Sequence, residues 1–217
     1  LDPMSSGEEA VLAHIIAAAR DHRVVIINES HVVTRHRDFS RKIIAALRPH
    51  GYSVLAAETF ANLPDNAPDW VDRLVDQTYI DRRLGYYSKE PVFGAMLREA
   101  KRLGYRFAAY EQPYDQDYER PKDWRIAIRD RETAQAANLA ALVKTLGPKE
   151  RLIVHVGYAH AREAAVVGED GWDHAWMAAR LKRDHGIDPL TISQTNCRGS
   201  ADSVRLAMPS ADQEGWF

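Results

Sequence analysis

The sequence is poor in cysteine, and Cys197 is the only thiol among 217 residues. A single thiol excludes a disulfide within the chain and any zinc site built from several cysteines. No apolar run approaches the roughly 20 residues that a membrane-spanning helix needs, so we expect no membrane span. Neither charge sign is in excess, with 29 Lys and Arg against 31 Asp and Glu. Proteins that bind nucleic acid carry a basic excess on one face, so we expect no nucleic-acid partner.

The rest of the composition is typical of a globular protein, with 45% hydrophobic and 28% charged residues. At this length we expect one compact domain over residues 1–217. The first residues, Leu1-Asp2-Pro3-Met4, resemble neither a signal peptide nor a natural start. The compartment therefore stays open: cytoplasmic if Met4 is the natural start, periplasmic or secreted if a leader was removed. The pattern does not reveal the oligomeric state.

Short β-branched or aromatic runs alternate with longer amphipathic stretches along the chain. This alternation is typical of βαβ units, so we predict an α/β fold with a mainly parallel central sheet flanked by helices. The expected strands are 23–27, 53–57, 105–110, 152–156 and 190–193. The expected helices are 8–20, 37–48, 91–103, 124–146 and 173–185. Within the polar tail, residues 204–208 could add an edge strand.

Residues 59–95 interrupt this alternation, because a direct connection from strand to helix needs only a few residues. The segment contains several prolines and aromatic residues, among them Trp70, Tyr86 and Tyr87. A helical insertion at this end of a sheet suits a lid or a substrate wall. The alternative is an extra helical hairpin that packs for stability alone.

Ionisable and amide side chains stand where each predicted strand ends. In chain order they are Asn28, Glu29, His31, Glu58, Glu111, His155, His160, Gln194 and Asn196. In open parallel sheets, ligands bind beyond the carboxyl ends of the strands. Burying carboxylates without partners is unfavourable, so a functional site explains this edge better than structure alone does.

Each acidic candidate has a structural alternative. Glu29 and His31 could cap the following helix, where the dipole favours an acidic side chain. Glu111 precedes a loop and could simply be solvated. Glu58 is the strongest single candidate, because a helix cap would more often be Ser, Thr, Asp or Asn.

The basic candidates are equally open. His155 lies within an apolar strand and could be a core histidine, whereas His160 is expected at a helix start. Arg35 and Arg37 could form a solvated helix face, or their guanidinium groups could reach an anion at the sheet edge. Gly157 follows a buried strand, where its backbone could approach a ligand and offer amide groups to an oxyanion.

Two common catalytic motifs are missing: the chain has neither a glycine-rich phosphate-binding fingerprint nor a G-x-S-x-G nucleophile elbow. The carboxylates and histidines instead suit acid/base activation of water, or a metal ion held by Glu and His.

Four short segments carry a resemblance, namely 28–31 (Asn-Glu-Ser-His), 51–58, 131–138 and 157–160 (Gly-Tyr-Ala-His). All four resemble motifs of the erythromycin esterase, ChaN and TraB/TIKI superfamily. Segment 28–31 resembles its Gly-Glu-x-His opening, and segment 51–58 resembles its glycine–strand–glutamate segment. Segment 131–138 resembles its Arg-(Asp/Glu)-x-x-x-Ala-x-Asn helix, and segment 157–160 resembles its Gly-x-x-His motif. The resemblance implies an α/β domain of that type, with water-activating hydrolases, metal-dependent proteases and haem-binding proteins as relatives. Asn28 replaces the usual glycine, and the chain is shorter than typical erythromycin esterases, which argues against macrolide hydrolysis.

The leading hypothesis is a hydrolase that acts on an ester, lactone or amide in a small-molecule or peptide substrate. A glutamate, Glu29 or Glu58, would act as general base, its pKa raised toward neutrality by burial and like charge. The histidines would stabilise charge or protonate the leaving group, and an arginine would hold a carboxylate or the oxyanion. The candidate catalytic residues are Glu29, His31, Glu58, His160, Arg35 and Glu111. The candidate substrate contacts are Arg37, His155, Tyr158, Tyr86 and Tyr87.

Two alternatives use the same region of the sheet. Glu29, His31 and His160 could instead hold a divalent metal such as Zn, Mn or Co, because imidazole and carboxylate suit these ions. The chain could also bind haem or another small ligand without catalysis, through a tyrosine or histidine at the sheet edge. The tyrosines considered are Tyr86, Tyr87 and Tyr158.

Overall fold

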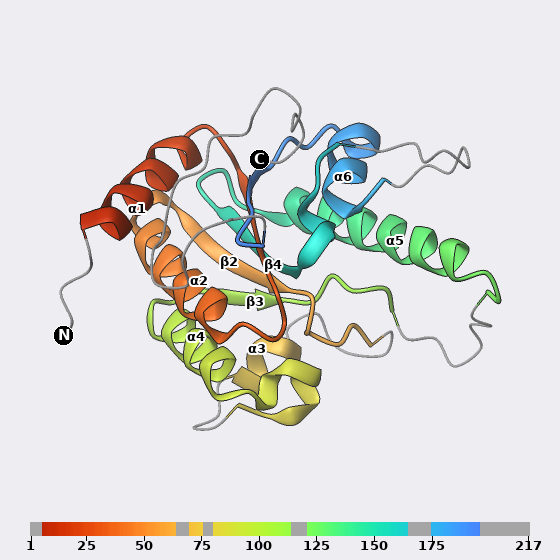
Figure 1. The fold of residues 1–217 in the computed structure, drawn as a ribbon, viewed down its shortest axis with the longest axis horizontal. Coiled ribbons are helices and arrows are strands. Elements are labelled where there is room, and N and C mark those ends of the chain that lie inside the picture. Colours follow the sequence, from red (N-terminus) through yellow and green to blue (C-terminus); the bar gives the residue numbers. More distant parts are fainter. Residues whose placement is uncertain (1–5, 64–69, 76–79, 114–120, 165–174, 196–217) are drawn as a thin grey trace.

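The computed structural model describes residues 6–63, 70–75, 80–113, 121–164 and 175–195. Within these residues, five strands form one all-parallel sheet in the order β3-β2-β4-β1-β5, which confirms the predicted α/β fold class (Figure 1). The strands are β1 (Val24–Glu29), β2 (Tyr52–Ala57), β3 (Arg106–Ala108), β4 (Arg151–Gly157) and β5 (Leu190–Ile192).

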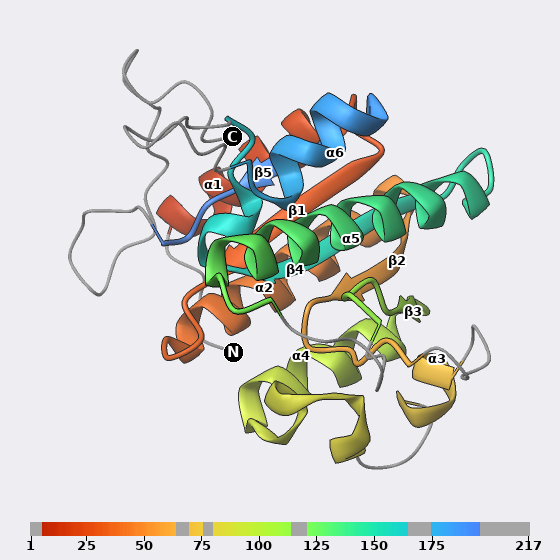
Figure 2. The ribbon, with the colours of Figure 1, turned by 90° about the vertical axis from the view of Figure 1, so that its right-hand side faces the viewer.

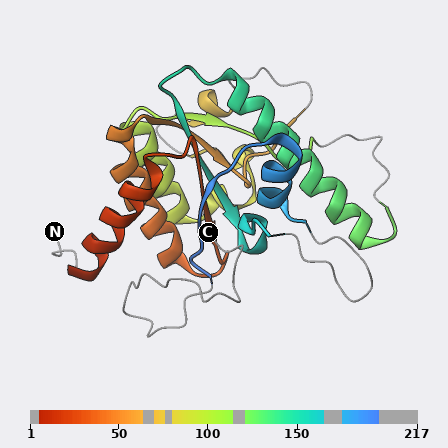
Figure 3. The ribbon, with the colours of Figure 1, turned by 90° about the horizontal axis from the view of Figure 1, so that it is seen from above.

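Helices cover both faces of this sheet. They are α1 (Ser6–Ala19), α2 (Thr34–Leu47), α3 (Trp70–Val75), α4 (Pro91–Arg102), α5 (Trp124–Thr145) and α6 (Met177–His185). Four short 3₁₀ helices complete the described elements: η1 (Arg48–His50), η2 (Arg82–Leu84), η3 (Tyr86–Lys89) and η4 (Tyr158–Ala161). The view from above shows α1, α2 and α4 on one side of the sheet and α5 and α6 on the other (Figure 3).

The strand sequences explain this layered arrangement. Successive side chains of a strand point to opposite faces, and those of β1 divide accordingly. Val25 and Ile27 join the apolar core beneath α1, α2 and α4, whereas Val24 and Ile26 join the core beneath α5. Every residue of β1 is buried, as expected for a parallel sheet covered on both faces.

The order of the strands positions the functional region. The chain passes from β1 to β2 through α2, and α5 later returns it so that β4 lies between β1 and β2 (Figure 2). The register places Glu29 opposite Gly157 and Ala57 opposite His155. The carboxyl ends of β1, β4 and β2 are therefore neighbours, although β1 and β2 do not pair with each other.

The predicted elements agree with the structure to within a few residues, with two differences at strand and helix ends. The strand expected over 105–110 is shorter, because β3 is an edge strand that pairs with β2 only along Arg106–Ala108. The last helix begins at Met177 rather than at 173, and residues 173 and 174 lie outside the described part. The possible strand over 204–208 also lies outside it.

The described part of the segment between β2 and α4 contains the helices α3, η2 and η3 as well as turns. Phe60 and Leu84 anchor it in the core, so part of the segment packs for stability. Its role as a lid stays a prediction. Within the described residues, no helix combines the length and the apolarity that crossing a bilayer requires.

Gly85, between η2 and η3, provides a test of this packing. Its φ is +145°, and an added Cβ would lie 1.5 Å from the carbonyl oxygen of Thr59. We expect Gly85→Ala to lower the free energy of unfolding by at least about 2 kcal/mol, because strain adds to a backbone clash. Gly147→Ala is the control, since its Cβ would meet only the Glu150 side chain, at 3.4 Å or more. Chemical denaturation should show a change within about 0.5 kcal/mol for the control; equal effects would contradict the described packing.

Candidate active site

The carboxyl ends of β1, β2 and β4 bring a set of ionisable side chains together. Glu29 is the last residue of β1, and Glu58 directly follows β2. The backbone N–H of Glu58 donates to the carbonyl of His155 at 2.9 Å, which extends the pairing of β2 with β4. His160 lies in η4, one short turn beyond β4. The sheet thus places both glutamates and His160 at one edge.

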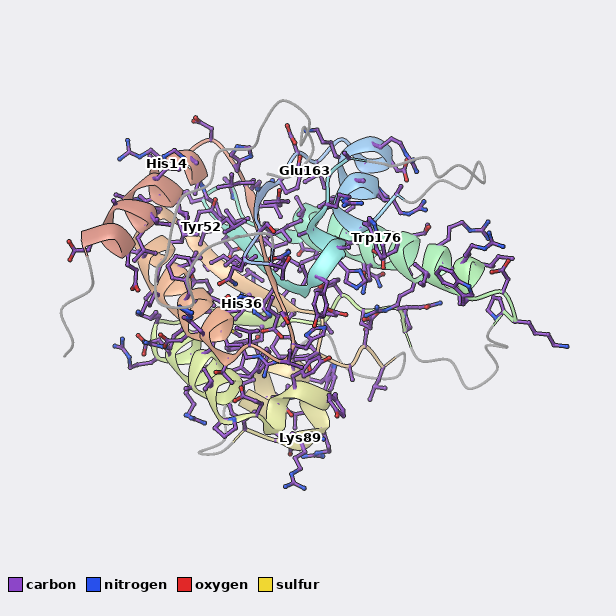
Figure 4. The ribbon with its side chains drawn as sticks, viewed as in Figure 1. His14, His36, Tyr52, Lys89, Glu163 and Trp176 are labelled. Atoms are coloured by element: carbon purple, nitrogen blue, oxygen red, sulfur yellow. The ribbon has the colours of Figure 1, made fainter. Side chains whose placement is uncertain are left out.

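Glu29 and His31 form a carboxylate–histidine pair. The Nδ1 atom of His31 lies 2.9 Å from Oε1 of Glu29. Glu29 is only 1% exposed, whereas the His31 side chain is 21% exposed, so the histidine is the accessible member. The following turn is held by the N–H of Ser30, which donates to Nδ1 of His36 at 2.9 Å (His36 is labelled in Figure 4).

Arg37 balances the negative charge of the Glu29 carboxylate. This arginine of α2 is 2% exposed and donates to both carboxylate oxygens, from Nε and from Nη2, at 2.8 Å each. Burial would raise the pKa of Glu29, but the hydrogen bonds from Arg37 and His31 outweigh it and lower the pKa to about 2. Glu29 is therefore an ionised carboxylate at neutral pH.

Arg37 also links this pair to the segment before α4. Its Nη1 donates to Glu90 at 3.0 Å and its Nη2 to the carbonyl of His31 at 3.1 Å. Glu90 in turn caps α4 by accepting from the backbone N–H groups of Val92 and Phe93. Arg37 was predicted to contact substrate, but it is buried and bound to protein groups. Arg37 is therefore placed to hold the Glu29 carboxylate in position.

His155 is likewise buried behind Glu29, in the middle of the sheet. Its Nε2 lies 3.5 Å from Oε2 of Glu29, and its ring meets the ring of Phe93 edge-on. Burial lowers the pKa of His155, so the ring is neutral at neutral pH. Although predicted as a substrate contact, this histidine is only 3% exposed and packs against Glu29.

Glu58 is the centre of a second group. Oε1 of Glu58 accepts from Nη2 of Arg131 at 2.7 Å and lies 3.6 Å from Nε2 of His160. Oε2 accepts from the backbone N–H of Gly157 at 2.7 Å. Burial would raise the pKa of Glu58, yet the positive charges of His160 and Arg131 together with these hydrogen bonds lower it.

His160 is paired with a buried carboxylate on its other side. Its Nδ1 lies 2.7 Å from Oε1 of Glu132, a residue of α5 that is 1% exposed. Burial favours the neutral ring, but the Glu132 carboxylate outweighs it, so the pKa of His160 is raised above 6.5. The ring also meets Trp176 edge-on, and Figure 4 shows Trp176 beside α5 and α6.

Gly157 lies between the two groups. A Cβ at this position would lie 2.4 Å from Nε2 of His31 and 3.1 Å from Oε2 of Glu58, so both side chains converge on the glycine. Only glycine permits this approach. Its amide was expected to be available to an oxyanion, and that expectation is wrong, because Glu58 accepts its hydrogen bond.

Aromatic rings enclose His31. Tyr87 stacks on it with ring centroids 4.4 Å apart, and Tyr158 meets it edge-on at 5.1 Å. Tyr158 has a φ of +37°, an uncommon value for a residue other than glycine and one that is often found at functional sites. Its hydroxyl lies 3.0 Å from Oγ of Ser30.

The remaining candidates lie further out. Tyr86 is 72% exposed and packs on Tyr87 and under the ammonium of Lys89, which projects from the margin of the molecule in Figure 4. Arg35 is exposed on α2, and Arg37 takes the place beside Glu29. Glu111 does lie near the group, since it accepts hydrogen bonds from Arg131 and Gln135.

The expectation that a glutamate has a raised pKa is wrong for both candidates. That expectation took account of burial and like charge but not of the cations that lie against the two carboxylates. Arg37 and the hydrogen bond from His31 at Glu29, and Arg131 and His160 at Glu58, favour the ionised carboxylates more strongly than burial disfavours them.

Sequence reasoning did not assign site roles to Arg131, Glu132 and Gln135, although the first two begin the helix segment that carried the resemblance. The spacing of the polar residues in this helix could have indicated a shared role. Arg131, Gln135 and Asn138 recur every three or four residues, which places polar side chains on one face of a helix whose neighbours pack into the core. All three form hydrogen bonds with Tyr110 or Glu111, which lie just beyond β3.

The donors do not form a recognisable metal site. Among the described residues, no group of three or more His, Cys, Asp or Glu side chains is arranged to hold a metal ion. Glu29, the one carboxylate of the predicted metal set, accepts hydrogen bonds from Arg37 at both oxygens. The metal set Glu29, His31 and His160 therefore stays an untested prediction, as does haem.

Comparisons with known proteins relate the chain to bacterial toxins and effectors by fold alone. No protein-family model and no curated protein matches the sequence. A bacterial protein toxin structure matches 88% of this chain with 18% identity and a TM-score of 0.57, over 37% of its own length. RRSP, a MARTX toxin effector domain from Vibrio vulnificus, matches 82% with 19% identity and a TM-score of 0.51, over 38% of its length. The type III effector HopBA1 matches 77% with 18% identity and a TM-score of 0.50, over 80% of its length.

These matches correct the family expected from the four short motifs. The structural similarity is to toxin and effector domains, and the assignment to the erythromycin esterase, ChaN and TraB/TIKI superfamily is wrong on this finding. The chain spans less than half of the toxin structures that it matches. At these identities the similarity shows the fold, and the chemistry of the site has to be argued from its own residues.

The lowered pKa of Glu29 predicts a pH dependence of stability. Because the folded-state pKa of about 2 lies below the ordinary 4.5, the unfolded chain takes up the proton first on acidification. The stabilisation is therefore complete above about pH 5 and is lost as the pH falls from there to about 2. It amounts to about 3 kcal/mol.

We expect Glu29→Gln to lower the free energy of unfolding at pH 7 and to flatten its decline between pH 5 and 2, measured by denaturant titration. Glu9→Gln, at an exposed position of α1, is the control and should keep the wild-type pH dependence. A Glu29→Gln profile parallel to that of the wild type would show that Glu29 does not titrate as described.

Proposed function

We propose that the chain is a hydrolase whose two carboxylate–histidine pairs activate water on an ester, lactone or amide. One observation carries the proposal: His31 and His160 each have Nδ1 beside a buried carboxylate and Nε2 on the side of Glu58. A carboxylate behind Nδ1 orients an imidazole and stabilises its protonated form, which is how histidine serves as a general acid or base.

In this proposal His31 is the general base. Its Nε2 removes a proton from a water molecule near Gly157, and the oxygen of that water attacks the substrate carbonyl. Glu29 stabilises the imidazolium that forms, while Arg37 keeps Glu29 ionised. The 21% exposure of His31, compared with 1% for Glu29, supports this division of roles.

His160 supplies the proton for the leaving group. The raised pKa of His160 favours the protonated ring at neutral pH, and Nε2 is the nitrogen nearer Glu58. The collapse of the tetrahedral intermediate breaks the bond to the leaving oxygen or nitrogen, which takes the proton from Nε2. Glu58 remains an anion between the two rings and stabilises whichever one carries the additional charge.

The aromatic rings beside His31 suit substrate contact. Tyr158 is 45% exposed and its hydroxyl is close to Ser30, so it can pack on a substrate and hydrogen-bond to it. Tyr87 is the wall behind His31, and the more exposed Tyr86 lies next to it. The substrate is a small molecule or a peptide.

The structural similarity to toxin and effector domains suggests where such a hydrolase acts. We infer that the chain is the catalytic module of a toxin or effector and modifies a component of a target cell. Induced expression in yeast should slow growth, and Glu58→Gln at equal expression should remove the effect. Growth inhibition by both forms would show that toxicity does not depend on this site.

The metal and haem hypotheses are tested by elemental analysis and an absorption spectrum of untagged protein. A stoichiometric divalent ion would favour metal-assisted hydrolysis over the proposal above. A Soret band would favour haem binding. The metal and haem hypotheses both concern this edge of the sheet, so the two measurements discriminate between chemistries at one region.

Glu58→Gln tests the hydrolase directly. The substitution keeps the shape of the side chain and removes the negative charge between the histidines. We expect kcat on a responsive ester or amide to fall by at least about 10²-fold, because transition-state charge loses its nearest partner. Glu99→Gln, on the outer part of α4, is the matched control. Circular dichroism should show that both variants fold, and retained activity in Glu58→Gln would refute the assignment.

A further inference from the structure

Each oxygen of the Glu132 carboxylate faces a different group, and the mechanism above uses only the oxygen that lies against His160. Glu132 is 1% exposed and lies on α5 behind His160. Oε2 accepts a hydrogen bond from the backbone N–H of Met177 at 2.7 Å, and Oε1 lies 2.7 Å from Nδ1 of His160. The first contact is to the start of α6 and the second is to the ring at the site.

The contact with Met177 determines which oxygen of Glu132 faces the His160 ring. Met177 is the first residue of α6, where a backbone N–H has no partner within the helix and a carboxylate is favoured. Because an amide N–H can only donate, the group opposite it must accept. Oε2 is thereby fixed, and Oε1 is left facing the ring.

A proton on the ring nitrogen that faces Oε1 is favoured over a bare nitrogen. Two lone pairs 2.7 Å apart would repel each other, whereas an N–H facing a carboxylate is attracted. The contact is short but not aligned as a linear hydrogen bond, so its attraction is mainly between charges. The other charged groups that face the ring are Glu58 and Arg131, and the ring of Trp176 covers its edge.

We propose that Glu132 is a positioning residue that holds His160 with a proton on Nδ1 and with Nε2 directed at Glu58. Nδ1 then keeps its proton throughout, and Nε2 is the nitrogen that exchanges a proton with the substrate. This inference rests on the proposed hydrolase for its catalytic consequence. The placement of the proton is a property of the resting protein and can be measured without a substrate.

Glu132→Gln is the decisive variant, because glutamine has the shape of glutamate with different donors. Its oxygen must still accept from Met177, so its NH₂ group must face His160. A donor at that position pairs only with a bare Nδ1, which moves the ring proton to Nε2. The variant should therefore fold and carry the opposite tautomer.

The tautomer is read from the imidazole ¹⁵N chemical shifts of His160 at pH 7, assigned by comparison with His160→Gln. We expect a protonated Nδ1 in the wild type and a bare Nδ1 in Glu132→Gln. On any substrate found, kcat should fall about 10²- to 10⁴-fold with KM unchanged, because the ring binds in place but presents the wrong nitrogen state. Asp130→Asn, which removes a charge from the outer face of the same helix, should alter neither reading.

A bare Nδ1 in the wild type, or a protonated Nδ1 in Glu132→Gln, would overturn the inference. If Glu132→Gln does not fold, the wild-type spectrum alone decides, since it must show the proton on Nδ1. The spectra could be as expected while no substrate is hydrolysed and Glu58→Gln leaves the growth of the yeast unchanged. In that case the hydrolase proposal fails and the proton placement stands.

Discussion

Two glutamates with little solvent exposure, at one edge of the sheet, remain ionised because an arginine lies against each of them. Arg37 donates to both oxygens of Glu29, and Arg131 donates to Glu58. Without these partners the carboxylates would be protonated or the strand ends would be unstable, since an unpaired buried charge is strongly unfavourable. The arginines come from α2 and α5, which cover opposite faces of the sheet. The site therefore depends on both helical layers being in place.

The order of the strands also makes the site depend on distant parts of the chain. Because β4 lies between β1 and β2, residues from three strand ends and two intervening helices meet around Gly157. Asn28 adds a further link, since its amide donates to the carbonyl of Tyr158 at 2.8 Å and its side-chain oxygen accepts from the N–H of Gln194. This amide holds the turn after β4 against the segment that follows β5. The carbonyl of Tyr158, a residue with an uncommon positive φ, is thus held by a side chain of β1.

The sequence predicted the strands, most helices and the edge at which Glu29, His31, Glu58 and His160 meet, because periodicity and strand-end chemistry are local properties. It did not predict the protonation of the glutamates, which depends on arginines distant along the chain. The four short motifs suggested a superfamily that the structural comparisons do not support, since such motifs constrain few residues. Roles in catalysis stay proposals, because a fold shared at 16–19% identity does not determine chemistry.

The proposed hydrolase activates water through His31 at this edge of the sheet. Incubation of the protein with a panel of esters, lactones and peptides in H₂¹⁸O, followed by mass spectrometry of the products, tests this step. We expect one ¹⁸O in the carboxyl group of the product formed by the wild type, and almost no product from His31→Asn. Products that form at the same rate with His31→Asn, or that carry no ¹⁸O, would contradict it.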